Sequence, residues 1–71
     1  MLEEAIVKKM VTNHLSSRSY ADRLMYLKDA FRNGYATGIF ISKVALELPV
    51  SEGGIQSKDV EQIALAHAEQ N

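Results

Sequence analysis

The chain contains the stretch SYADRLMYLKDAFRNG at residues 19–34, and this stretch carries a signal for each end of a helix. Ser19 is a favoured N-cap residue, because its hydroxyl accepts a hydrogen bond from a backbone N–H of the first turn. Gly34 stands directly after the helical pattern, where glycine adopts backbone angles that other residues avoid. The sequence therefore predicts a helix from about Tyr20 to Asn33.

The apolar side chains of this predicted helix recur at steps of four, three and four residues. They are Tyr20, Leu24, Leu27 and Phe31. This spacing places all four on one face of a helix, as in the seam between two packed helices. We expect this face to be the seam of a homodimer.

The length of the chain also favours a second copy. With 71 residues, we expect one small helical domain over residues 1–71. Domains of this size bury only about 60% of their unfolded surface and commonly need a disulfide, a metal or a partner subunit. The chain has no Cys, which excludes a disulfide and a thiolate zinc site. A partner subunit is then the favoured source of additional stability.

Two further segments are predicted to be helical. The first spans residues 2–14, where Leu2, Ile6 and Met10 follow one another at steps of four. The second spans residues 58–69 and has a narrow apolar face. Ser57 is expected to cap this last helix at its N-terminus.

Residues 35–48 fit two structures. A helical stripe is formed by Phe40, Ile41, Val44, Ala45 and Leu48. An alternation typical of a strand is formed by Val44, Leu46, Leu48 and Val50. We favour a helix, because a lone strand would leave its backbone N–H and C=O groups without partners. The predicted fold is an all-α compact bundle of three to four short helices, and a short β-hairpin in residues 38–50 is the alternative.

Composition and charge favour a cytoplasmic protein. The formal net charge is −1, 24% of the residues are charged, and no run of eighteen apolar residues occurs. The first four residues, Met1-Leu2-Glu3-Glu4, are acidic, unlike the basic start of a signal peptide. We therefore expect a soluble protein without a membrane contact, and the mild charge excludes a strongly basic nucleic-acid binder.

Residue patterns for catalysis and metal binding are weak. His14 and His67 have no His or acidic residue at helical spacing beside them, which a metal site on a helix needs. The serines outside the predicted helices stand at loop or cap positions, without a base to activate them; they are Ser16, Ser17, Ser19, Ser51 and Ser57. We expect no enzymatic activity, no cofactor and no metal ion.

Five residues of the 19–34 stretch are predicted to bind another protein. Met25 and Tyr26 point away from the seam, and three cations accompany them. The predicted partner-binding residues are Arg23, Met25, Tyr26, Lys28 and Arg32. Aromatic and Arg side chains commonly dominate the binding energy of protein interfaces. We expect a small regulator, adaptor or inhibitor that docks this apolar and basic helical surface on a larger protein.

Binding of DNA is the alternative function. The two predicted helices joined at Asn33-Gly34 fit a small helix-turn-helix transcriptional regulator, whose second helix enters the major groove. That helix offers only Ser42 and Lys43 to the bases, with hydrophobic neighbours, and this is a poor surface for reading base edges. Protein binding is therefore the favoured function.

Overall fold

The computed structural model describes residues 3–49 and 54–70, and within these ranges the chain is helical with no strand. Its elements are α1 (Glu4–Ser16), α2 (Tyr20–Asn33), α3 (Tyr35–Leu46) and α4 (Ser57–Gln70). The predicted all-α fold is confirmed. The hairpin alternative is wrong, because residues 38–46 lie in one continuous helix. Leu2 and Val50, which the predictions included, lie outside the described residues.

The ends of α2 are the predicted ones. The Ser19 hydroxyl accepts a hydrogen bond from the Asp22 backbone N–H at 3.3 Å. At the other end, Gly34 has a φ of 153°, which side-chain-bearing residues rarely adopt. The Gly34 N–H donates to the Phe31 carbonyl at 3.1 Å. A single glycine therefore ends one helix and starts the next.

The start of α4 corrects a prediction. Ser57 is the first residue of the helix and not its cap, so Gln56 occupies the N-cap position. The Asp59 carboxylate accepts a hydrogen bond from the Gln56 backbone N–H at 3.0 Å. This is the returning half of a capping box, in which an acidic residue of the first turn bonds the N-cap backbone. Ile55, just before the cap, is buried in the core.

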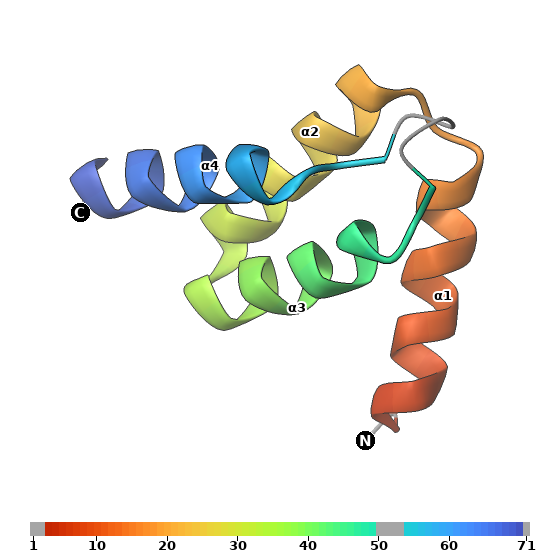
Figure 1. Ribbon diagram of the computed structural model, residues 1–71. Coiled ribbons are helices and arrows are strands. Elements are labelled where there is room, and N and C mark those ends of the chain that lie inside the picture. The colour runs from red at the N-terminus through yellow and green to blue at the C-terminus, as the bar shows by residue number, and fades with distance from the viewer. Residues whose placement is uncertain (1–2, 50–53, 71) are drawn as a thin grey trace.

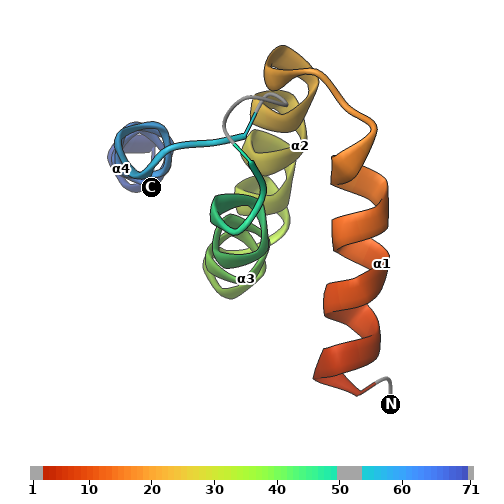
Figure 2. The ribbon, with the colours of Figure 1, turned by 45° about the vertical axis from the view of Figure 1, so that its right-hand side comes forward.

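The helices form a flat arrangement with α2 and α3 at its centre. Figure 1 shows α1 on one side of this pair and α4 on the other. Figure 2 views α4 nearly end on and shows the same order across the molecule. The extents of the molecule are 34 × 30 × 16 Å, so it is thin in one direction. None of the helices in the described ranges has the length and apolar character needed to cross a membrane.

The core lies where α2 meets α3. The Phe31 ring packs directly over Gly38, and a Cβ added at Gly38 would lie 2.3 Å from two ring carbons. Only glycine therefore fits at this position without moving the helices apart. The other buried apolar residues are Val11, Leu15, Leu27, Ala30, Ile41, Val44, Ala45, Ile55 and Ile63.

The predicted dimer seam belongs to this single-chain core. Leu27 and Phe31 are 0% and 1% exposed, and Leu24 packs against the core cluster. Of the four seam residues, only Tyr20 keeps substantial exposure, at 41%. The prediction that Leu27 and Phe31 contact a second copy is wrong, because the chain buries both side chains within itself.

Candidate functional site

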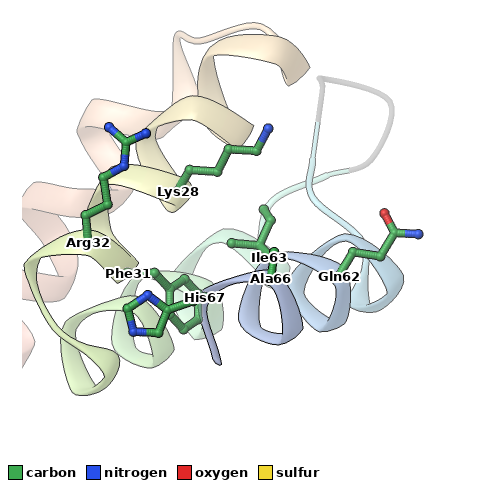
Figure 3. A pocket seen from close by; sticks show the side chains of 7 residues that line it. All are labelled: Lys28, Phe31, Arg32, Gln62, Ile63, Ala66 and His67. Atoms are coloured by element: carbon green, nitrogen blue, oxygen red, sulfur yellow. The ribbon is translucent and has the colours of Figure 1, made fainter. Parts of the chain in front are cut away.

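A groove of about 420 Å³ runs between α2 and α4 (Figure 3). It is lined by Lys28, Phe31, Arg32, Gln62, Ile63, Ala66 and His67. Its volume falls within the range of sites that enclose ligands or anchoring side chains of a partner. We call this feature the α2–α4 groove.

One wall of the groove is basic. Lys28 and Arg32 are four residues apart, so both project from the same side of α2. Figure 3 shows their two cationic side chains on the α2 side of the groove. Met25 precedes Lys28 by three residues and lies on the same exposed strip of α2, with 63% of its surface accessible. An apolar side chain thus stands next to the cationic wall.

The floor of the groove is apolar and partly aromatic. Phe31 and Ile63 are both buried, and they come from the two helices that form the walls. The His67 ring lies 5.8 Å from the Phe31 ring between centroids. Tyr35 joins them, with its ring 5.8 Å from Phe31 and 6.5 Å from His67. This cluster of three rings fixes the last turns of α4 against the joint of α2 and α3.

The charge of the groove is positive. Its lining holds two permanent cations and, among the described residues, no acidic side chain. Arg32 lies 3.6 Å from Asp29, measured from Nη1 to Oδ1, with both side chains largely exposed. Exposed ion pairs of this length contribute little, because water screens them. The lining therefore presents a positive field beside an apolar floor.

The N-terminal end of α4 makes a second contact with α2. The Tyr20 hydroxyl donates a hydrogen bond to Asp59 Oδ1 at 2.8 Å. The Gln56 N–H, bonded to the other carboxylate oxygen, contributes most to lowering the pKa of Asp59, and Tyr20 contributes next. The same bond with Asp59 raises the pKa of Tyr20, because the carboxylate stabilises the protonated hydroxyl. The width of the groove is thus set by the Asp59 contact at one end and by the rings at the other.

The structure separates the five predicted partner-binding residues. Lys28 and Arg32 line the groove, whereas Met25 is exposed three residues before Lys28 and is not part of the lining. Tyr26 lies on another side of α2, half-buried, with its ring 4.6 Å from that of His14 on α1. The predicted set is therefore not one surface.

Arg23 is buried, and its prediction as an exposed docking residue is wrong. Its side chain is 0% exposed. Nε donates to the Leu15 carbonyl at 2.8 Å, and Nη2 donates to the Ser16 carbonyl at 3.3 Å. Both carbonyls belong to the C-terminus of α1, where the helix dipole favours a cation. Within the described structure, Nη1 is buried without a hydrogen-bond partner.

The α4 wall was missed by sequence reasoning. The sequence predicts only a narrow apolar face for the helix over residues 58–69, and His67 was considered only as a metal ligand. Residues at positions 62, 63, 66 and 67 share one side of a helix, and this spacing was the available signal. The α2 residues opposite them could not be identified without knowing how the helices cross.

The predicted recognition helix, α3, is buried along one side. Ser42 is 2% exposed, and its hydroxyl donates to the Gly38 carbonyl at 2.6 Å. Of the two polar residues that α3 offered to DNA, only Lys43 reaches the surface. The geometry therefore gives the DNA-binding alternative no added support.

Comparisons of the chain with models of known protein families, with curated proteins and with solved structures found no match. In the described ranges, no group of three or more His, Asp or Glu side chains is arranged to hold a metal ion. Inference about function therefore starts from the chemistry of the α2–α4 groove.

Proposed function

We propose that this protein is a small protein-binding regulator or adaptor, which takes an acidic and partly apolar segment of a larger protein into the α2–α4 groove. One observation carries the proposal: Lys28 and Arg32 form a cationic wall directly beside the buried Phe31 and Ile63. A segment that carries carboxylates beside a large apolar side chain complements both halves of this lining.

The two cations differ in what they can recognise. The guanidinium of Arg32 can donate two parallel hydrogen bonds to one carboxylate, whereas the Lys28 ammonium acts as a compact charge. An aromatic or aliphatic side chain of the partner would cover Ala66 and the partly exposed His67 above the buried Phe31, and would displace water from the groove. In such an interface the buried apolar anchor supplies most of the affinity, and the cations at the rim supply selectivity and a faster encounter.

The proposed mechanism of action is occlusion. A segment that lies in the groove is covered along one face and is withheld from other contacts of the larger protein. The groove requires no chemical step, since binding alone changes what the larger protein can do.

The proposal is tested by titrating the isotope-labelled protein with a designed helical peptide whose one face carries Glu, Leu and Phe. The control peptide replaces each Glu with Gln, which keeps the shape and removes the charge. We expect chemical-shift changes concentrated in α2 and α4, and affinity at least about tenfold weaker for the Gln peptide.

Charge-reversal variants locate the binding surface. Lys28→Glu with Arg32→Glu should weaken binding of the Glu peptide by at least about tenfold. The matched control combines Lys9→Glu and Arg18→Glu, which changes the net charge equally at exposed positions outside the groove. Equal weakening in both double variants would show unspecific attraction and contradict the proposal. Salt-sensitive binding of duplex DNA with no response to the peptide would favour the alternative function instead.

A further inference from the structure

The two ends of the α2–α4 groove differ. The N-terminal ends of α2 and α4 meet where Tyr20 donates its hydrogen bond to Asp59. Their C-terminal ends meet where the rings of Phe31 and His67 lie 5.8 Å apart between centroids. The two helices therefore run in the same direction along the groove. We call the end at Phe31 and His67 the C-terminal end of the groove.

A cation of α2 and an imidazole of α4 stand at the C-terminal end of the groove. Arg32 directly follows Phe31 and lies in the last turn of α2. His67 lies in the last turn of α4. Figure 3 shows Arg32 and His67 at the same end of the groove, with Gln62 at the other. An acidic group that enters the C-terminal end thus has Arg32 on one side and His67 on the other.

The helix termini at this end make the charge of the imidazole important. The C-terminus of a helix carries a partial negative charge, because its last carbonyls have no partner within the helix. Both α2 and α4 end here, and their termini repel an acidic group. Arg32 offsets the repulsion on the α2 side. On the α4 side only a protonated His67 can do so, because the other described residues of α4 in the lining carry no charge.

Three helices contribute the charged and titratable groups around His67. They are Lys28 and Arg32 on α2, Tyr35 on α3 and Glu69 on α4. Glu69 is only two residues from His67, so it projects from another side of the helix. Asp29 pairs with Arg32 and does not line the groove. A proton on His67 therefore adds a positive charge to a lining that, in the described part of the chain, holds no acidic side chain.

The aromatic cluster accommodates both forms of the His67 ring. A neutral imidazole packs on the rings of Phe31 and Tyr35, and a cation within about 6 Å of an aromatic ring is attracted to its face. Protonation thus changes the charge of the groove without moving His67 out of it. Histidine is also the side chain whose charge ordinarily changes between about pH 5 and about pH 8.

We propose that His67, in its protonated form, is the α4-side binding residue for an acidic group of the partner, opposite Arg32. This inference rests on the proposed function of the groove and adds that binding takes up a proton. A carboxylate of the partner then accepts charge-assisted hydrogen bonds from both walls. Proton binding and segment binding strengthen each other by the same factor, so the affinity for an acidic segment rises as the pH falls.

The experiment measures binding of the Glu and Gln peptides by isothermal titration calorimetry at about pH 8 and about pH 5.5, where the peptide carboxylates are still largely ionised. We expect the wild-type protein to bind the Glu peptide at least about fivefold more tightly at the lower pH. Its affinity for the Gln peptide should be the same at both. At about pH 7, buffers with different heats of ionisation should reveal a net uptake of protons when the Glu peptide binds.

The two histidines of the chain provide a matched pair of variants. His67→Gln should abolish the pH dependence and keep the weaker affinity of the wild type at high pH. The control is His14→Gln on α1, where the ring packs against Tyr26 outside the groove, and it should keep the full pH dependence. Circular dichroism at both pH values verifies that the variants stay helical, and the proton uptake of the wild type needs no variant.

The outcomes distinguish the role of His67 from the function on which it rests. Equal affinity for the Glu peptide at both pH values, without proton uptake, overturns the role of His67 and leaves the proposed function standing. A pH dependence that persists in His67→Gln, or that disappears in His14→Gln, overturns this role as well. If the Glu peptide binds at neither pH, both proposals are overturned.

Discussion

Two neighbours of α2, the helices α3 and α4, meet the same aromatic ring of α2 in opposite ways. On one side of Phe31, α3 presents Gly38, and the helices touch with no room for a methyl group. On the other side, α4 presents Ile63 and His67, whose larger side chains hold it away and leave the groove. The Phe31 ring therefore belongs to the core towards α3 and lines the groove towards α4. The size of the side chain opposite the ring decides whether the helix packs closely on it or leaves a groove.

The largest expected effect is on the α3 side of this comparison. Gly38→Ala places a methyl group inside the Phe31 ring, so α2 and α3 have to separate. We expect a loss of about 3 kcal/mol in the free energy of unfolding, at the upper end of overpacking costs. Urea denaturation followed by circular dichroism measures it.

A second substitution tests the cause. Phe31→Leu in the Gly38→Ala background removes the ring that the methyl group meets, so the double variant should lose less stability than the two single changes together. Strictly additive losses would show that the ring and the glycine are not coupled, and the close contact would then not be what joins α2 to α3.

The next effect compares two cations of α2, one inside the molecule and one in the groove. Arg23→Ala removes a fully buried side chain and its bonds to two carbonyls of α1, and should cost about 2 to 3 kcal/mol. Lys28→Ala, at an exposed position of the same helix, should change stability by less than about 0.5 kcal/mol. Similar costs for both variants would contradict the burial of Arg23. Thermal and urea unfolding of the two proteins decide between these outcomes.

The course of the chain was predictable where local chemistry determines it. The ends of α2 follow from Ser19 and Gly34, because capping and φ preferences act within a few residues. The burial of Arg23 was not predictable, since a cation is normally at the surface and its actual partners are carbonyls seven and eight residues away in α1.

Of the two walls of the groove, only the one on α2 could be predicted from the sequence. Lys28 and Arg32 were found because charged residues on a helix flank mark an exposed face. The same helical spacing made Leu27 and Phe31 look like a seam between two copies. Spacing shows that a face is covered, but it does not show whether the cover is a second copy or another helix of the same chain.

A smaller effect concerns the contact that positions α4. The pKa of Asp59 in the folded state lies below its ordinary value of 3.8, chiefly because the Gln56 N–H and then the Tyr20 hydroxyl stabilise the carboxylate. This contribution to stability is complete above pH 3.8 and is lost as the pH falls through the lower folded-state pKa. Asp59→Asn should cost about 1 kcal/mol at neutral pH and flatten the acid dependence of the unfolding free energy.

Tyr20→Phe refines this prediction, because it removes the bond that contributes less to the lowered pKa of Asp59 and keeps the Gln56 N–H. The acid dependence should then decrease but persist. Urea midpoints measured at several acidic pH values compare the three proteins. An Asp59→Asn protein with the full wild-type slope would mean that another carboxylate causes it, and α4 would then be held by its apolar contacts alone.

The smallest expected effect is at the groove itself. Lys28→Ala combined with Arg32→Ala removes both cations of the wall, and the only ion pair that the described structure gives them is the exposed one between Arg32 and Asp29. Such pairs contribute at most about 1 kcal/mol, and commonly much less, so urea midpoints should be nearly those of the wild type. The same protein should bind the Glu peptide at least about tenfold more weakly. If the double variant instead loses much of its stability, the two cations hold α2 to α4. The groove would then have a structural role and no role in binding. A double variant that keeps its stability but loses binding would show that folding does not need these two side chains. The side of α2 that faces the groove would then differ in role from the side that packs on α3.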